Sequence, residues 1–522
     1  MNRRISGIAV ALLVLAGCST DTVAPLKSPP AVRLDRSADE QGNKGQYLVL
    51  MRGSSIDARF EGRVNGLGGQ VRRRHDAVGF AAVSGLTDVT AAQLLTAPGV
   101  SEVIPDVQIS LDLPAAPVEA DGSAVGTAIT PSQADPTLAI VYSWQWNMRL
   151  IKANEAWAAG KVGKPKVTVA ILDTGIDYDS FDLDGLVDLK RSHSFMNVFL
   201  PATPTSPVRP ADDTVTKYYF SNRNQISDYH GHGTNVATQV SSKAVYFAGV
   251  TSRTTLIGVK VLGSNGVGLL GTVLSGIIWA ADHDADVANV SLGNAGFPQT
   301  GNEALIAIID RVFDYAKRKR MLVVVSAGNA SQDLDNNGDT YAAYCDAPHV
   351  ICVSAVGPAT PTGNPDQPAF YTNFGRRSID VAAPGGNADL TGTLSPWPWG
   401  PSNGSPVWSL CSKTRITAWT SGNAPGSIPC FPGNFGYSPI GTSQAAPHVA
   451  GLAALLMSIS GSKSNDIKEI ILESADDLGP RGRDAYFGEG RINVARALRE
   501  QRRHDDDHRG DDDRDWNRGD HH

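Results

Sequence analysis

The sequence contains few cysteines and no basic excess, and its N-terminal apolar run is short. Only 5 of its 522 residues are cysteines, and no short C-x-x-C pair occurs, which argues against metal or catalytic chemistry at cysteine. The 46 basic residues are outnumbered by 53 acidic ones, giving a net charge of −7, so the basic surface expected of a nucleic-acid-binding protein is missing. The apolar run at residues 5–16 is too short to cross a bilayer.

Apolar residues make up 41% of the chain, with 53 glycines and 31 prolines, which suits a turn-rich globular enzyme with appended segments. Short apolar, β-branched segments alternate with helical patterns in the larger part of the chain. Strands are predicted at 167–172, 255–262, 285–292, 321–325 and 349–356, and helices at 232–240, 269–282, 303–318 and 443–457. This alternation predicts an α/β fold with a mainly parallel sheet and helices on both faces.

One serine lies where a glycine turn leads into an apolar helix. Gly441 and Thr442 precede Ser443, and small and apolar residues follow to position 456, so a buried helix should begin at or beside Ser443. A serine in this position commonly caps a helix. The alternative is a nucleophile, because the unpaired N–H groups of a helix N-terminus can stabilise an oxyanion. Partners elsewhere in the chain decide between the two.

Two earlier stretches supply such partners. Asp173 follows the predicted strand 167–172 and should lie at its carboxyl end, and His232 stands between glycines at the start of a predicted helix. Each residue alone has an ordinary structural explanation, as a turn cap or a core histidine. The set of Asp, His and Ser in this order favours nucleophilic catalysis.

The motifs around these residues resemble those of the subtilisin-like serine proteases, the peptidase S8 family. The family pattern D-[ST]-G is matched at 173–175, H-G-T-x-V-A at 232–237 and G-T-S-x-A-x-P-H-V-A-G at 441–451. A fourth match is the strand 321–325 with the following stretch 326–329. Gln444 and Ala446 replace a usual Met and a usual Ser or Thr, at positions that carry no proton transfer.

This resemblance implies a serine endopeptidase that forms an acyl-enzyme with Asp173, His232 and Ser443 as its triad. Asn329 and the backbone N–H of Ser443 would form the oxyanion hole. No cofactor is required, and proteins and peptides are the substrates. Substrate-binding residues by resemblance are Gly266, Val267, Gly268, Ser291, Leu292 and Gly293 along two edges and Ser326, Ala327 and Gly328 at the P1 pocket. The rivals are a peptide-binding pseudo-protease and an esterase, although the esterase elbow G-x-S-x-G is absent around Ser443.

The N-terminus is interpreted as a targeting segment. Arg3 and Arg4 before the apolar run indicate a signal peptide over 1–17. The residues before Cys18 resemble a bacterial lipoprotein box, which implies a lipid-anchored envelope protein with a polar tether over 18–45. The alternative is an ordinary secretory signal, giving a secreted extracellular protein.

Residues 46–113 predict a small α+β unit. Strand-like and helix-like pieces follow in the order β-α-β-β-α-β, with Thr87 or Asp88 capping the second helix, which is the ferredoxin-like pattern. In order and position this unit resembles the inhibitor propeptide of the protease family. An unrelated binding domain is the alternative. The Ala-, Pro- and Ser-rich linker 114–140 would then contain the processing site, and the propeptide would act as an intramolecular inhibitor.

The catalytic domain is predicted over 141–500, in a monomer. It carries a long insert at 385–437, whose aromatic residues should form their own small core or a substrate-contacting rim. The residues from 501 to 522 are rich in Asp, Arg and His and predict a disordered tail. Loose binding of divalent cations is an alternative to a purely solvating role.

Four cysteines remain beside Cys18, and an exported chain would pair them. Three pairings are open. Local pairing of Cys345 with Cys352 and of Cys411 with Cys430 is preferred, because the first pair brackets a short turn at 346–349 and the second would crosslink the long insert. A calcium loop is a weaker hypothesis, since Asp333, Asp335 and Asn337 match its opening but Tyr344 stands where a bidentate Glu belongs. A solvated turn is favoured, and structural calcium remains the alternative because family members often bind it.

Overall fold

The chain forms a small N-terminal unit packed on a larger α/β domain. The computed structural model describes residues 45–111, 113–114, 118–120, 130–197, 211–293, 296–360, 362–388, 404–419, 425–427, 436–460 and 464–504. The predicted signal peptide, Cys18, most of the tether, Cys430 and most of the tail lie outside these residues.

The N-terminal unit has the predicted β-α-β-β-α-β order. Its elements are β1 (Gln46–Met51), α2 (Phe60–Gly66), β2 (Gln70–His75), β3 (Phe80–Ser84), α3 (Asp88–Leu94) and β4 (Val100–Pro105). The strands lie in the order β2-β3-β1-β4 and pair antiparallel, which confirms the ferredoxin-like arrangement. Thr87 caps α3 through a capping box with Thr90, because its side chain accepts the Thr90 N–H.

The larger domain is built on a seven-stranded sheet in the order β16-β15-β13-β11-β7-β9-β8, and all its pairs are parallel. Its strands are β7 (Thr168–Asp173), β8 (His193–Ser194), β9 (Thr255–Lys260), β11 (Val287–Val290), β13 (Leu322–Ser326), β15 (Val350–Val356) and β16 (Val381–Pro384). Each of the five predicted strands is present, within a few residues of its expected ends. The predicted parallel α/β sheet is therefore confirmed.

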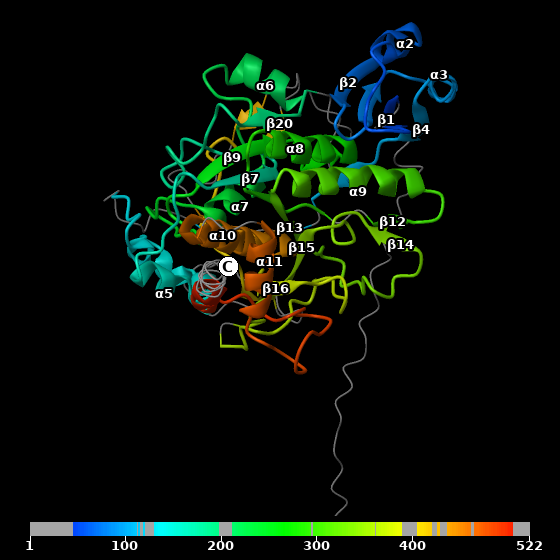
Figure 1. Ribbon diagram of the computed structural model, residues 1–522. Helices are drawn as coiled ribbons and strands as arrows, with labels where there is room; N and C mark the ends of the chain where they lie inside the picture. Colours follow the sequence, from blue (N-terminus) through cyan, green and yellow to red (C-terminus); the bar gives the residue numbers. More distant parts are fainter. Residues whose placement is uncertain are drawn as a thin grey trace, which may run out of the picture.

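Helices cover both faces of this sheet, as Figure 1 shows. They are α7 (His232–Val240), α8 (Leu270–Asp282), α9 (Glu303–Arg318), α10 (Thr442–Ser460) and α11 (Ser464–Glu473). Side chains alternate along β7, so that Val169 and Ile171 join the core beneath α7 and α10, while Ala170 and Leu172 join the core beneath α8 and α9. In Figure 1 the N-terminal unit, in blue, lies over α8 and α9.

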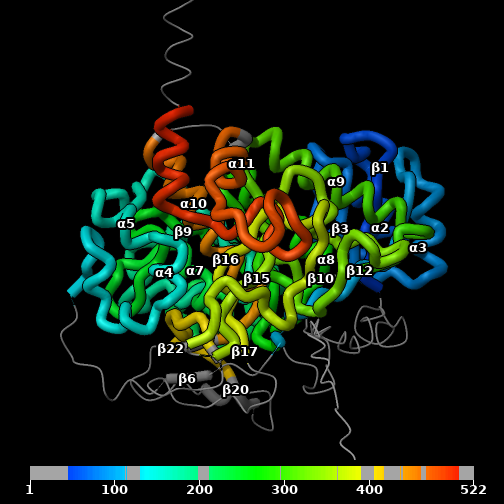
Figure 2. Tube along the Cα trace, turned by 90° about the horizontal axis from the view of Figure 1, so that it is seen from below, coloured from blue at the N-terminus to red at the C-terminus, as the bar shows by residue number. Residues whose placement is uncertain are grey.

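Other short elements were not expected from the sequence. They are α4 (Trp146–Leu150), α5 (Ala153–Ala158), α6 (Asp212–Tyr219), η2 (Pro136–Leu138), η3 (Tyr142–Trp144), β5 (Gln108–Ser110), β6 (Val118–Ala120), β10 (Val267–Leu269), β12 (Gly296–Pro298), β14 (Thr340–Ala342), β17 (Asn387–Ala388), β18 (Gly404–Ser405), β19 (Ser409–Leu410), β20 (Ile416–Trp419), β21 (Pro425–Ser427) and β22 (Gly436–Ser438). Figure 2 shows α4 and α5 at the opposite end of the molecule from the N-terminal unit.

Three expectations need correction. Trp408, expected in a separate core of the insert or on a substrate rim, belongs to the main core and packs edge-on against Trp144 at 5.5 Å between ring centroids. The tail was expected to begin at 501, but a helix over 494–504 includes its first four residues, and buried Gln501 donates to the Leu456 carbonyl. The linker was expected to extend to 140, yet Gln133 already exchanges hydrogen bonds with Ser252.

Candidate active site

Asp173 and His232 meet at the carboxyl end of the sheet. Asp173 ends β7, and His232 is the first residue of α7. The histidine Nδ1 lies 2.8 Å from Asp173 Oδ1 and 3.0 Å from Oδ2, and both side chains are fully buried. Nε2 of the same ring is buried and makes no hydrogen bond within the described part of the chain. A neutral imidazole held in this way on one nitrogen can accept a proton on the other.

A buried carboxylate that the sequence analysis did not single out, Asp228, organises the start of α7. Its Oδ1 accepts from the Gly231 N–H at 2.9 Å and from the Thr174 hydroxyl at 2.9 Å, and its Oδ2 accepts from the N–H of Thr234 at 2.9 Å. Burial would raise the pKa of Asp228, but these hydrogen bonds hold it below its usual value. Its position four residues before His232, ahead of a predicted helix, was the available signal.

Ser443 is the second residue of α10 and is 3% exposed. Pro447 lies inside this helix and has no N–H to give to the Ser443 carbonyl. The Ser291 hydroxyl donates to that carbonyl instead, at 2.8 Å, and receives a bond from Asn289 Nδ2 at 2.9 Å. Ser291 therefore fixes the backbone that carries the candidate nucleophile, in addition to lying on a predicted substrate edge.

Asn329, the predicted oxyanion donor, follows β13 and lies beside the turn that precedes Ser443. Its Oδ1 accepts hydrogen bonds from Thr442, and its Nδ2 is 3.4 Å from where a Cβ at Gly441 would stand. A side chain at position 441 would therefore crowd this amide. The structure brings Asn329 to the same turn as Ser443, although the two are 114 residues apart in sequence.

The predicted substrate edge at 266–268 is covered by the chain's own N-terminal segment. β5 pairs antiparallel with β10, with Ile109 opposite Gly268, and the Leu111 N–H donates to the Gly266 carbonyl at 2.9 Å. Gly266 has φ +73°, and a Cβ there would stand 3.4 Å from both Leu111 Cδ1 and His230 Nε2. The glycine thus allows the close approach of the two backbones.

The other predicted substrate residues lie at the ends of β11 and β13. The Ser326 hydroxyl donates to the Leu292 carbonyl at 2.9 Å and joins the stretch 291–293 to the stretch 326–328. Both stretches end buried strands at the same edge of the sheet as Asp173.

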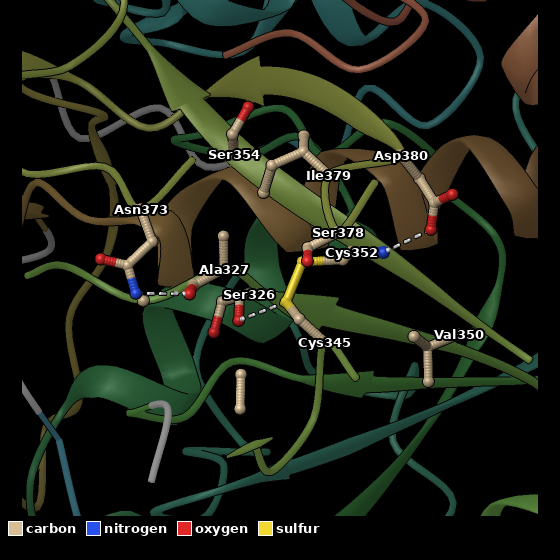
Figure 3. Close-up of a disulfide and its surroundings, with 12 residues drawn as sticks. Ser326, Ala327, Cys345, Val350, Cys352, Ser354, Asn373, Ser378, Ile379 and Asp380 are labelled. Carbon is tan, nitrogen blue, oxygen red and sulfur yellow. Dashed lines mark hydrogen bonds between the residues drawn. A yellow bond between two sulfur atoms is a disulfide. The ribbon is translucent and has the colours of Figure 1, made fainter. Parts of the chain in front are cut away.

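The disulfide between Cys345 and Cys352 is formed as predicted. Figure 3 shows it at the start of β15, with Cys345 beside the Ser326 carbonyl. Cys411 is disulfide-bonded as well. Its predicted partner, Cys430, lies outside the described residues.

In the stretch considered as a calcium loop, the carboxylates of Asp333 and Asp335 accept hydrogen bonds from the protein itself. Asp335 Oδ1 accepts from Ser378, and Oδ2 accepts from the Arg377 N–H at 2.8 Å. Asp333 accepts from the N–H groups of 335 and 336 in its own turn. These contacts fit a structural turn better than a calcium loop. Among the described residues, the group of three metal-ligand side chains that come within reach of one another is Glu473, Glu500 and His504, at the surface.

The Subtilase family profile, Peptidase_S8, matches residues 164–490. Relatives include the thermophilic serine proteinase of Bacillus sp. strain AK1, which is 29% identical over 68% of this chain and 67% of its own. Thermitase of Thermoactinomyces vulgaris is 28% identical over 68% of this chain and 96% of its own. Subtilisin DY of Bacillus licheniformis is 29% identical over 67% of this chain and 97% of its own.

Solved structures share the fold. Fervidolysin of Fervidobacterium pennivorans aligns with a TM-score of 0.60 at 21% identity, over 88% of this chain and 62% of that one. The epidermin leader peptide processing serine protease of Staphylococcus aureus aligns with a TM-score of 0.62 at 20% identity, over 87% and 97%. The family match covers more than half of the chain and includes Asp173, His232 and Ser443. The chain therefore belongs to the subtilase family and is a subtilisin-like serine endopeptidase.

Proposed function

We propose that this protease cleaves peptide bonds through an acyl-enzyme formed on Ser443, with His232 as general base and Asp173 as its orienting carboxylate. The contact of His232 Nδ1 with both Asp173 oxygens is the observation that carries this proposal. In the first step Nε2 takes the Ser443 hydroxyl proton as the oxygen attacks the substrate carbonyl carbon. The imidazolium then protonates the leaving amine, and water repeats the sequence to release the acid.

The negative charge on the attacked carbonyl oxygen would be held by the Asn329 amide and the Ser443 N–H. Thr442 supports this role, because it occupies the amide oxygen and leaves the amide nitrogen as the donor end. Ser443 adds its own N–H near the start of α10, where backbone N–H groups have no partner within the helix.

We also propose that residues 46–111 act as an intramolecular inhibitor. The antiparallel pairing of β5 with β10 uses the same backbone groups that an extended substrate would use. A second contact supports tight docking: buried Asp106 accepts the Gly271 N–H at 3.0 Å and so caps α8, which has no side-chain cap of its own. The strand pairing and this cap would hold the unit over the predicted substrate edge before processing.

Self-processing is proposed between residues 111 and 118. Leu111 lies at the edge formed by β10, whereas β6 pairs antiparallel with β22, which ends at Ser438, five residues before Ser443. Residues 111 and 118 are thus held on either side of the stretch proposed to be cut, one at the predicted substrate edge and the other beside the strand that leads to Ser443. The proposed processing bond therefore lies among the first residues of the predicted linker 114–140 or just before residue 114.

Export is proposed from the N-terminal sequence, with Cys18 as the lipidated residue of an envelope protein. No helix within the described ranges is long and apolar enough to span a membrane. A purely secreted protein without lipid is the alternative.

The test of the catalytic proposal is casein cleavage by the full chain, with and without a serine-directed sulfonyl fluoride. Cleavage that stops with stoichiometric labelling of Ser443 supports it, and Ser443→Ala should be inactive. A chain that binds peptides without cutting them would be a pseudo-protease. Cleavage of simple esters but not of casein would instead indicate an esterase.

A further inference from the structure

Residues 409–416 of the insert, called the histidine brace below, lie against the loop and helix that carry His232. Leu410 is buried in the main core, and β19 packs against α7, so the brace is anchored in the body of the domain. Three of its hydroxyl groups and one N–H donate to backbone carbonyls within residues 228–235. That stretch includes the catalytic histidine and the loop before it.

Two hydroxyl groups of the brace donate to one backbone oxygen. Ser412 Oγ lies 2.5 Å and Thr414 Oγ1 lies 2.9 Å from the Asp228 carbonyl oxygen. Both side chains are buried. Together they give this carbonyl two donors, which satisfies both lone pairs of its oxygen.

The brace also holds the chain on both sides of His232. The Ile416 N–H donates to the Tyr229 carbonyl at 2.8 Å, before the histidine. The Ser409 hydroxyl donates to the Asn235 carbonyl at 3.1 Å, one turn after it. The loop and the first turn of α7 are thus both tied to a single short segment.

Cys411 lies beside Gly231, the residue immediately before His232. Gly231 has φ +103°, and a Cβ there would stand 3.9 Å from Cys411 Sγ and 3.7 Å from Arg415 Cδ. Cys411 is disulfide-bonded, so a covalent link restrains the brace beside the residue that precedes His232.

Asp228 links the brace to the residues that surround His232. The Asp228 carboxylate accepts N–H groups from His230, Gly231 and Thr234, which surround the histidine in sequence. It also accepts the hydroxyl of Thr174, the neighbour of Asp173. A shift of the Asp228 backbone would therefore move the imidazole relative to the carboxylate that orients it.

We propose that the histidine brace positions His232 for proton transfer, with Ser412 and Thr414 as the positioning residues. The inference rests on the proposed triad. It assigns a catalytic support role to a segment of the insert 385–437, which was expected to form a separate small core or a substrate rim.

The test uses the full chain carrying Ser412→Ala together with Thr414→Val, assayed with a chromogenic peptide. Loss of alignment should lower kcat about 10- to 100-fold, the range expected for a small misplacement of a catalytic group. KM should change less than twofold, because neither residue lies on a substrate edge. The rate of labelling by phenylmethanesulfonyl fluoride should fall in the same proportion as kcat, since labelling also needs His232 to remove the serine proton.

Two controls separate positioning from stability. Ser458→Ala removes another buried hydroxyl, which donates to the Ala454 carbonyl late in α10, and should leave kcat unchanged. Thr414→Ser keeps the hydroxyl and should restore the activity that Thr414→Val alone loses, which keeps the inference testable if the double variant does not fold. If the wild type is active and the brace variants have the same kcat and the same labelling rate as the wild type, the inference is wrong. Activity retained by Ser443→Ala would contradict the proposed function itself.

Discussion

Thr442 binds the Asn329 side chain through two hydrogen bonds to a single atom. The Thr442 N–H and its hydroxyl both donate to Asn329 Oδ1, each at 2.9 Å, and the same hydroxyl accepts the Gly328 N–H at 3.0 Å. An amide whose oxygen is held on one side has its nitrogen fixed on the other. The residue before the nucleophile therefore orients the proposed oxyanion donor.

We predict that Asn329→Ala lowers kcat by about 10² to 10³, the usual loss when an enzyme of this family loses one oxyanion donor. KM should barely change, because the contact forms with charge that exists only in the transition state. The measurement is kcat per active site, titrated with a covalent inhibitor, beside a thermal melt. Near-wild-type turnover with a lower melting temperature would show that Asn329 stabilises a turn and does not act as the oxyanion donor.

A second prediction concerns maturation. Ser443→Ala should accumulate as an uncut precursor, whereas the wild type should lose its N-terminal unit and show a new N-terminus between residues 112 and 118. Intact mass and N-terminal peptide mapping distinguish the two forms. Normal processing of the variant in a host without other proteases would contradict self-cleavage.

The docked N-terminal unit should be sensitive to pH through His75. Its Nε2 lies 2.9 Å from Ser275 Oγ on α8, and burial, followed by the charge of Arg73, lowers its pKa from 6.5 to about 4. A lowered pKa means that the folded precursor resists protonation. The stability that this interface contributes is therefore present above pH 6.5 and is lost as the pH falls towards 4.

The measurement is the melting temperature of the Ser443→Ala precursor from pH 7 to 4, with and without His75→Gln. The variant carrying His75→Gln should lose less stability on acidification. Burial raises the pKa of Asp106 to about 7, so its contribution has the opposite sign and is lost as the pH rises towards 7. Asp106→Asn should accordingly steepen the acid loss, and parallel curves for all three proteins would refute the assignment.

Removing the disulfide between Cys345 and Cys352 should have a modest effect. The two residues are only 7 positions apart, so the bond closes a short loop and the entropic model gives about 2 kcal/mol. The free energy of unfolding of the double Ser variant, measured by urea denaturation, checks this figure. In a non-reducing digest, a crosslink from either residue to Cys411 or Cys430 would contradict local pairing.

Lipidation is tested by Cys18→Ser. The wild type should partition with membranes and carry an acyl mass on its N-terminal peptide, and the variant should move to the soluble fraction. Identical fractionation of the two proteins, without an acyl mass, would favour a plain secretory signal.

The sequence by itself determined the parts of the fold that depend on local pattern. Apolar β-branched runs such as 321–325 became strands, and periodic stretches such as 303–318 became helices, because burial of one face or of a whole strand imposes those patterns. The motifs at 173–175, 232–237 and 441–451 likewise identified Asp173, His232 and Ser443 as candidates, because the glycines in these motifs mark tight turns next to a strand or a helix.

Only the tertiary structure showed those features of the protein that depend on contacts between residues far apart in sequence. The short helix α6 and strand β16 carry weak local signals, and Trp408 entered the main core because Trp144, 264 residues away in sequence, packs against it. Asp228 and Thr442 acquire their roles through partners brought together by folding. The brace at 409–416 has no periodicity of its own, and its hydrogen bonds exist because the α7 loop presents buried carbonyl groups that need donors.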